Sequence, residues 1–402
     1  MENNQLYEIL TKAIDEKHIY SELTDSYKAL GSEYKPEYIV YAQNTEEIAK
    51  LVKLANEHEF AIYPIGSGSM FAKGVDRLQK GIILSTKDLN KVMEYRPHNL
   101  SIEVEAGMTT KDLQEYLEKD NLFYPMDTDE NSTIGGQIAS NRYGENRYIY
   151  KSARFYVLGL EFVSPEGEIV QVGGRTVKNV TGYDISQLLA GSWGNFGIIT
   201  KATLKIKPRP EKNLTLTFNS YDLTEIKKIV IALFREKISL ATINIYNKEQ
   251  RYYLTVKLEG FSETIRHQAE LLRRKYELYK ITGNIIDASS YKGMIALSLE
   301  NIIEGIEVLE NLATKYQKYL SFKGNLTNGI IEFEISKSPE RYLQNLATIL
   351  KSLEGTLIYD DKVLVKPSRG TGYGMLLQRI KDKVDPNSVL IPQSKALRGN
   401  LL

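Results

Sequence analysis

The sequence predicts an α+β protein with two domains. Its 402 residues are many for a single hydrophobic core, and apolar residues make up 42% of the chain, which is ample to fill two. Apolar segments of strand length alternate with longer amphipathic segments along the sequence. Lys207-Pro-Arg-Pro210 places two prolines within four residues and so stops both a helix and an interior strand. We place the domain boundary there.

For the first half, the sequence predicts a small layer of helices and strands, followed by a larger layer that is rich in strands. Helices are expected at 6–17 and after Thr45, which we take as an N-cap. A third helix begins at Thr109, because Asp112 three residues later completes a capping box. Strands are expected at 38–41, 60–63, 81–84, 100–105, 155–163 and 168–172, and Ser164-Pro-Glu-Gly167 makes the last two a hairpin.

The second half has a different pattern, in which helices and strands alternate more evenly. The expected helices are 222–235, 262–279, 302–316 and 339–353, and the expected strands are 241–246, 251–258, 294–299, 329–335 and 356–358. This order indicates an α+β domain built from two similar halves.

Composition excludes several classes of function. Lys and Arg (52) balance Asp and Glu (51), so the chain has no overall field that would attract nucleic acid or an anionic membrane. The absence of cysteine excludes disulfides, thiolate nucleophiles and an iron–sulfur cluster held by this chain alone. No leader sequence and no membrane-spanning segment is evident. We expect a cytoplasmic protein, peripheral to the inner face of a membrane only through partners.

Three glycine-bearing segments follow one another in the first half. They are Pro64-Ile-Gly-Ser-Gly-Ser69, Ser132-Thr-Ile-Gly-Gly136 and Gly191-Ser-Trp-Gly-Asn-Phe-Gly-Ile-Ile-Thr200. Glycine lets backbone N–H groups approach a pyrophosphate closely. The first segment alone reads equally well as a surface turn, since Phe71 stands where a dinucleotide-binding turn has its third glycine. The three in this order predict a flavin site.

The longer run Gly173-Gly-Arg-Thr-Val-Lys-Asn-Val-Thr-Gly-Tyr-Asp184, followed by Leu188–Thr200, carries a family resemblance. Residues 38–208 resemble the FAD-binding domain of the vanillyl-alcohol oxidase family, also called the PCMH type. The two runs closely resemble the FAD-binding subunits of glycolate oxidase and their D-lactate dehydrogenase relatives, and Leu377–Asn387 resembles the C-terminal signature of the same enzymes. The resemblance implies a two-subdomain FAD-binding domain at 1–210, an α+β substrate or cap domain at 211–365, and a C-terminal segment, 366–402, that packs back on the FAD domain.

The resemblance also implies which residues hold FAD. Residues 65–69 would bind the pyrophosphate, Thr133 with the two glycines that follow would pass beneath the flavin, and 197–199 would reach the adenine side. Asn179, Tyr183 and Asp184 match the motif but would equally well fix a buried loop. The residues implied at the cofactor are Pro64, Ile65, Gly66, Ser67, Gly68, Ser69, Thr133, Gly135, Gly136, Arg142, Tyr143, Gly144, Asn179, Tyr183, Gly197, Ile198 and Ile199.

The cofactor is expected to be noncovalent. Some relatives attach FAD through a histidine just after the pyrophosphate loop, where this chain has Ser69 and Met70.

The histidines depart from the resemblance. Oxidation of a 2-hydroxy acid commonly uses a base, often His, and a cation for the carboxylate. The four histidines, His18, His58, His98 and His267, each read more simply as surface or partly buried side chains. Catalytic glycolate oxidase subunits carry a C-terminal histidine cluster that includes metal ligands, and no histidine follows residue 267 here. We therefore expect no metal site and a closer similarity to the shorter second FAD-binding subunit.

Three cations are candidates for binding a substrate carboxylate: Arg369, Lys366 and Arg142. Arg369 also reads as a solvated loop residue. No catalytic residue is assigned.

The resemblance implies an FAD-binding subunit of a glycolate or lactate dehydrogenase or oxidase complex that acts on a CH–OH group, with a second FAD-binding subunit and an iron–sulfur subunit as partners. The alternative is a non-catalytic subunit of such a complex that relays electrons or serves as a scaffold. Two more distant readings are a cofactor-free binding protein on the same fold and an NADPH-linked flavin reductase of cell-wall synthesis.

Overall fold

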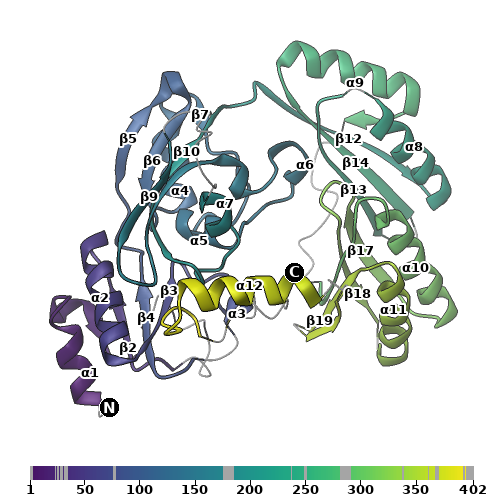
Figure 1. Ribbon diagram of the computed structural model, residues 1–402. Helices are drawn as coiled ribbons and strands as arrows, with labels where there is room; N and C mark the ends of the chain where they lie inside the picture. The colour runs from purple at the N-terminus through teal and green to yellow at the C-terminus, as the bar shows by residue number, and fades with distance from the viewer. Residues whose placement is uncertain are drawn as a thin grey trace. The chain divides into compact units, whose positions relative to one another are not determined.

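The computed structural model shows an α+β fold, as predicted (Figure 1). It describes residues 3–394 except 23, 25–26, 28–29, 31–34, 76–77, 175–184, 237, 249–250, 281–290, 337–338, 361, 367–370 and 393. The chain divides into two compact units. Unit 1 contains Met1–Gly144, Ser152–Arg209 and Gly370–Leu401, and unit 2 contains Glu145–Lys151 and Pro210–Arg369.

Unit 1 begins with a four-stranded sheet in the order β1-β2-β4-β3. Its strands are β1 (Ile19–Tyr20), β2 (Tyr38–Tyr41), β3 (Ala61–Ile65) and β4 (Gly81–Ser85), and the last three run parallel. Helices α1 (Asn3–Leu10) and α2 (Thr45–His58) share a core with this sheet. The N-cap of α2 is Asn44 and not Thr45 as predicted, because the Asn44 side chain accepts a hydrogen bond from Glu47 N at 2.9 Å.

The second layer of unit 1 is an antiparallel sheet in the order β5-β6-β10-β8-β9. Thr109 is confirmed as an N-cap, since its Oγ1 accepts from Asp112 N at 3.1 Å. The Asp112 carboxylate accepts from Thr109 Oγ1 at 2.6 Å, in place of the backbone N–H that a capping box would use. The predicted hairpin is also confirmed. The strands are β5 (Val92–Arg96), β6 (Ser101–Glu105), β8 (Val157–Val163), β9 (Ile169–Gly173) and β10 (Ile198–Lys205), and the helices nearby are α4 (Thr110–Glu118), α5 (Ile134–Ala139) and α7 (Ile185–Leu189).

Short elements connect these layers. They are η1 (Glu16–His18), α3 (Phe71–Gly74), η3 (Pro97–Asn99), η4 (Ala153–Tyr156), and the strand pair β7 (Leu122–Phe123) with β11 (Lys207–Pro208).

A buried carboxylate connects the two layers of unit 1. Glu161 on β8 is 6% exposed, and its oxygens accept hydrogen bonds from Thr45 at 2.8 Å and Thr200 at 3.0 Å. Gln171 and Lys201 donate to it as well, at 3.0 and 3.1 Å. Burial raises the pKa of the Glu161 carboxyl, but these four donors outweigh burial and hold its pKa below the ordinary value. Thr45, the first residue of α2, is thus bonded to the second sheet.

The ionised state of Glu161 should make unit 1 more stable at neutral than at acid pH. A carboxyl whose pKa is lowered by folding stabilises the protein fully above its unfolded pKa, and this contribution is lost as the pH falls through the folded pKa. We expect Glu161→Gln to cost about 1.5–3 kcal/mol at pH 7, and this cost to shrink as the pH falls through the folded pKa, which lies below the ordinary value of a glutamate. Urea unfolding of both proteins over a series of acid pH values measures the difference. A loss that is the same at every pH would contradict it.

Unit 2 contains a nine-stranded sheet in the order β15-β12-β14-β13-β17-β18-β16-β19-β20. The two similar halves predicted from the sequence are confirmed. Each half runs strand-helix-strand-strand-helix-strand, and the halves meet where β13 pairs with β17. The first half holds β12 (Lys212–Ser220), α8 (Leu223–Arg235), β13 (Leu240–Lys248), β14 (Arg251–Gly260), α9 (Ser262–Tyr276) and β15 (Tyr279–Lys280). The second holds β16 (Gly293–Ala296), α10 (Ile302–Lys315), β17 (Leu320–Asn325), β18 (Ile330–Ile335), α11 (Glu340–Ser352) and β19 (Thr356–Tyr359), followed by β20 (Lys362–Val365).

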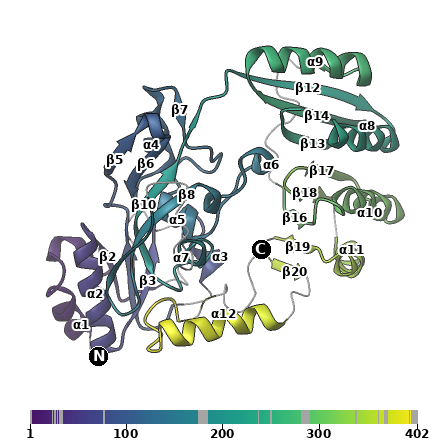
Figure 2. The same cartoon turned by 45° about the horizontal axis from the view of Figure 1, so that its top comes forward.

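Helices α8 to α11 lie on one face of this sheet and share its core (Figure 2). On β13, β14 and β17 the residues that alternate to the other face are polar, and α6 (Arg147–Tyr150) contacts β13. Tyr150 donates to Glu259 at 2.7 Å, Asn325 donates to the carbonyl oxygen of Glu145 at 3.2 Å, and Lys323 forms an ion pair with the Glu145 carboxylate. Residues 145–151 therefore belong to unit 2, although they fall inside the 1–210 segment.

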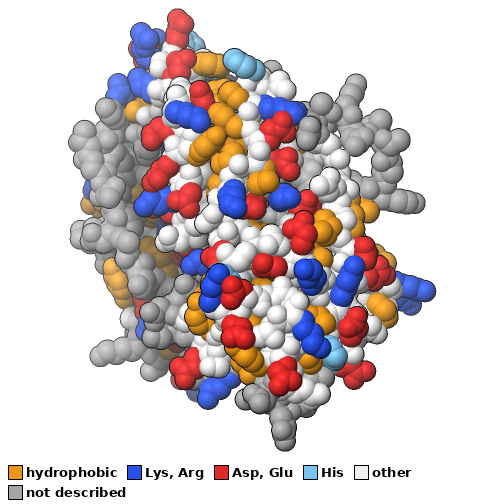
Figure 3. Space-filling model, turned by 90° about the vertical axis from the view of Figure 1, so that its left-hand side faces the viewer, with side chains coloured by type: hydrophobic (Ala, Val, Ile, Leu, Met, Phe, Trp, Pro, Cys, Tyr) orange, Lys and Arg blue, Asp and Glu red, His pale blue; other side chains and the backbone are white. Residues whose placement is uncertain are grey.

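Helix α12 (Thr371–Val384) belongs to unit 1, where Leu377, Ile380 and Val384 pack against the core of the second layer. Within the described part of the chain, every helix is too short or too polar to span a bilayer. On the face drawn in Figure 3, acidic and basic side chains are interspersed among the coloured residues, in keeping with the formal net charge of +1.

Candidate functional site

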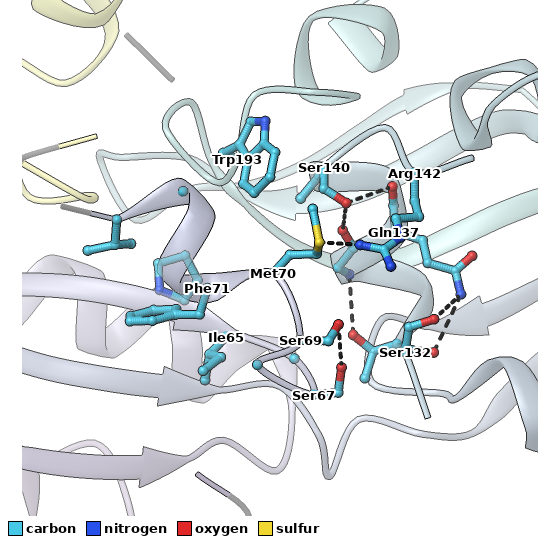
Figure 4. Close-up of a pocket in the computed structure, with 18 of the residues that line it drawn as sticks. Ile65, Ser67, Ser69, Met70, Phe71, Ser132, Gln137, Ser140, Arg142 and Trp193 are labelled. Carbon is cyan, nitrogen blue, oxygen red and sulfur yellow. Dashed lines mark hydrogen bonds between the residues drawn. The ribbon is translucent and has the colours of Figure 1, made fainter. Parts of the chain in front are cut away.

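A pocket in unit 1 brings the first two glycine segments together (Figure 4). Its volume is about 600 Å³ when counted out to open solvent. The end of β3 and the loop after it form one wall, the start of α5 forms another, and Trp193 and Ile391 contribute from the third glycine segment and the C-terminal segment. The lining residues are Pro64, Ile65, Gly66, Ser67, Gly68, Ser69, Met70, Phe71, Gly74, Val75, Ser132, Thr133, Gly136, Gln137, Ala139, Ser140, Arg142, Trp193 and Ile391.

Two glycines give the first loop its shape. A Cβ on Gly66 would lie 1.9 Å from Thr133 Oγ1, so only glycine lets this loop approach the second segment so closely. Gly68 has φ +83°, in the left-handed region. The Tyr27 hydroxyl holds the loop by donating a hydrogen bond to the Gly66 carbonyl oxygen at 2.7 Å. Burial raises the pKa of this hydroxyl, so it stays protonated and remains a donor.

The second segment carries a buried polar side chain without a full set of partners. Thr133 caps α5 by accepting from Gly136 N at 3.3 Å. Gln137, 1% exposed, donates from Nε2 to Ser132 Oγ at 2.8 Å and to Thr110. Among the described residues, Gln137 Oε1 has no hydrogen-bond partner. A buried acceptor of this kind costs free energy unless a donor reaches it.

Arg142 supplies the charge of the pocket. It is the only charged side chain among the described residues that line it, and its guanidinium lies against the Met70 sulfur in Figure 4. Serine hydroxyls line the same region, whereas Phe71, Val75 and Trp193 give the pocket an apolar part. The lining thus suits a ligand that combines an anionic group with an apolar group.

Nine of the residues predicted at the cofactor line this pocket: Pro64, Ile65, Gly66, Ser67, Gly68, Ser69, Thr133, Gly136 and Arg142. Gly135, Tyr143, Gly144, Gly197, Ile198 and Ile199 do not line it. Asn179, Tyr183 and Asp184 lie outside the described residues.

Local packing accounts for the glycines that do not line the pocket. A Cβ on Gly144 would lie 1.9 Å from the Asp127 carboxylate, one on Gly135 would lie 2.8 Å from Ala106 Cβ, and one on Gly197 would lie 2.6 Å from the Phe162 ring. Ile198 and Ile199 are buried at the start of β10.

Sequence reasoning assigned no role to several lining residues, among them Gln137, Ser140, Trp193 and Ile391. The sequence did offer a reason to place Trp193 at the site, because it is the only tryptophan of the chain and stands inside the third glycine segment. Nothing in the sequence pointed to Ile391, since it lies about 320 residues from the first loop along the chain.

None of the four histidines lines the pocket. His18 contacts the Gln43 amide at 3.3 Å, and His98 and His267 are exposed. Of the candidate cations, Arg142 lies in the pocket, Lys366 lies in unit 2, and Arg369 is outside the described residues. Among the residues that the structure describes, no cluster of three His, Cys, Asp or Glu side chains is arranged to hold a metal ion.

Comparison with known proteins identifies the domain around this pocket. Residues 36–173 match the family model of an FAD binding domain. This segment contains both glycine segments that meet in the pocket. The chain therefore carries an FAD-binding domain over this segment.

Its sequence relatives are oxidoreductases. The chain is 34% identical over 215 residues to glycolate oxidase subunit GlcD of Bacillus subtilis (strain 168), which covers 53% of this chain and 46% of that protein. It is 32% identical over 232 residues to a D-lactate dehydrogenase of Anaerostipes hadrus, covering 58% of this chain and 49% of that one. The aligned part thus spans about half the length of these curated relatives.

Solved structures share the fold. The model superposes on p-cresol methylhydroxylase with a TM-score of 0.74 at 15% identity, covering 99% of this chain and 96% of that chain. It superposes on alkyldihydroxyacetonephosphate synthase with a TM-score of 0.75 at 15% identity, covering 97% and 84%.

Proposed function

We propose that this chain binds FAD noncovalently in the pocket of unit 1 and serves in the oxidation of a small 2-hydroxy acid, glycolate or lactate. The observation that carries the proposal is the meeting of two glycine segments beside a single cation, Arg142, inside the matched domain. The lining fits the cofactor. Backbone amides of 65–69 and the Arg142 guanidinium match a pyrophosphate, and the unpartnered Gln137 Oε1 matches an N–H or O–H donor.

Each part of the pocket then has a task. Residues 65–69 and Arg142 bind the anionic part, Gln137 orients the cofactor through its free acceptor, and Trp193 with Phe71 covers an apolar part. When bound, FAD supplies an acceptor for the hydride of the substrate CH–OH group. Ser69 and Met70 offer no histidine for covalent attachment. The carboxylate of the substrate would meet Arg142, Lys366 or Arg369.

Anaerobic mixing tests the proposal. The purified chain, loaded with FAD, is mixed with D-lactate, L-lactate and glycolate in turn while flavin absorbance is followed. We expect bleaching with one of them, and acid precipitation should release the yellow cofactor into the supernatant. Failure of the chain to retain FAD would overturn the binding proposal. Flavin left in the protein pellet would contradict noncovalent binding.

A second candidate function is that of a non-catalytic FAD-bearing subunit, which relays electrons or serves as a scaffold in a complex with a second FAD-binding subunit and an iron–sulfur subunit. What favours it is the absence of histidine after residue 267 and from the described lining of the pocket. Here the FAD-loaded chain stays yellow with all three acids but restores turnover when mixed with the partner subunits. Bleaching of the isolated chain would exclude this alternative.

A further inference from the structure

A buried ion pair joins the C-terminal run Leu377–Asn387 to the interior of unit 1. Lys381 Nζ lies 2.5 Å from Asp385 Oδ2, and the two side chains are 3% and 1% exposed. They stand one turn apart, near the end of α12 and just beyond it. Burial lowers the pKa of Lys381. Two charges hidden from water are costly unless further bonds satisfy them, so the remaining partners of this pair indicate what it does.

Those partners are backbone groups from two other segments. Lys381 Nζ donates to the carbonyl oxygen of Asn195 at 2.8 Å and to that of Leu390 at 2.6 Å. The Asp385 carboxylate accepts from the N–H groups of Val389 and Leu390, both at 2.9 Å. The lysine thus uses its three donors on three acceptors. One is Asp385 just beyond α12, one belongs to the third glycine segment, and one to residues 389–391.

Both of the segments held by Lys381 reach the pocket. Asn195 follows Trp193 by two residues, and Trp193 lines the pocket. Asn195 itself is fully buried, and its side chain donates to Ser192 O at 2.6 Å and Ser394 Oγ at 2.8 Å. A shift of the Asn195 backbone would therefore move the Trp193 ring.

Residues 389–391 lie along β3. Ile62 N donates to Val389 O at 2.8 Å, and Ile391 N donates to Ile62 O at 3.1 Å. Strand β3 leads into the first loop of the pocket, and the Ile391 side chain lines it. The C-terminal segment therefore contributes Ile391 to one side of the pocket. Lys381 connects this segment, through Leu390, to the segment that carries Trp193, through Asn195.

We propose that Lys381 is a positioning residue of the cofactor pocket: it touches no part of the pocket lining, but it fixes Trp193 and Ile391 where they meet FAD. The proposal rests on the proposed binding of FAD in this pocket. It means that the C-terminal run affects the affinity for FAD by holding the third glycine segment, which lies about 190 residues earlier in the sequence.

The test compares Lys381→Met with Lys383→Met, a matched control that removes an exposed lysine from the same helix. FAD is titrated into the apoprotein, and the emission spectrum of Trp193, the only tryptophan, is recorded before and after. We expect Lys381→Met to raise the Kd for FAD about 2- to 30-fold, as for a change that couples to a site through packed side chains, and to shift the Trp193 emission of the apoprotein. Lys383→Met should change neither.

A double variant separates positioning from stability. Lys381→Met leaves a buried unpaired carboxylate, whereas Lys381→Met with Asp385→Leu removes it, so the thermal midpoint of the double variant should recover in part. It should not recover fully, because the N–H groups of Val389 and Leu390 lose their acceptor. We expect FAD affinity and Trp193 emission to stay altered in the double variant. Recovery of both along with the midpoint would overturn the proposal, as would wild-type affinity and emission in folded Lys381→Met. Because Trp193 emission is read in the apoprotein, a wild-type chain that does not bind FAD would count against the proposed function and not against this inference.

Discussion

Gly68→Asp should abolish the retention of FAD. Gly68 lines the pocket in the loop proposed to hold the pyrophosphate, and its φ of +83° lies in the left-handed region. A carboxylate on this loop adds a negative charge beside the two of the pyrophosphate, and each like-charge contact at close range costs about 1–4 kcal/mol. We expect the Kd for FAD to rise by at least about 100-fold. Flavin absorbance after gel filtration, relative to protein concentration, measures the loss.

Gly68→Asn is the matched control for this change. Asn has nearly the same shape as Asp and tolerates a positive φ, so both variants carry the same backbone strain. A Cβ at this position meets only ordinary contacts, the nearest at 3.4 Å to the side chains of Ile65 and Tyr27. The Asn variant should keep most of its FAD. Equal losses in the two variants would show that the defect is one of shape, and retention in both would mean that the pyrophosphate lies elsewhere.

The fold could be predicted from the sequence where local patterns decide it. The Thr109 N-cap and the hairpin at Ser164–Gly167 depend on residues three to five apart, and both are confirmed. Strands β12 and β17 were missed. Lys212–Ser220 is rich in polar side chains, and Leu320–Asn325 is short and contains a glycine. Both are strands because their neighbours in the sheet pair with them, which no local pattern reveals.

The site could be predicted only along its continuous segments. Gly66 and Gly68 stand out because backbone that closely approaches an anion requires glycine. Gln137 gave no signal, since its unpartnered oxygen depends on where Ser132 and Thr110 lie. Ile391 gave none either, because it reaches the pocket through a bridge between Leu390 and Ile62 at the edge of a parallel sheet. The proposal for Lys381 likewise needed the folded chain.

Arg142→Met should weaken FAD binding about 10- to 150-fold, since a hydrogen bond to a charged group is worth about 1.5–3 kcal/mol. Arg142 is the only charged side chain among the described residues of the lining. Arg142→Lys keeps the charge but loses the planar fork, and should fall between wild type and the Met variant. Because charge carries the effect, raising the salt concentration should weaken FAD binding by wild type more than by Arg142→Met. Titration of the apoproteins with FAD at two salt concentrations measures both quantities.

The same variants decide between the two tasks considered for Arg142. An arginine that binds pyrophosphate changes the Kd for FAD and leaves the KM of the fully loaded protein for the hydroxy acid nearly unchanged. Loss of an arginine that binds the substrate carboxylate raises the KM for the hydroxy acid and leaves the Kd for FAD nearly unchanged. We expect the first result, because Arg142 follows the α5 segment whose Thr133 contacts the Gly66 loop. A raised KM with unchanged FAD affinity would move Arg142 to the substrate and leave the backbone amides of 65–69 to hold the pyrophosphate without a cation from the described lining.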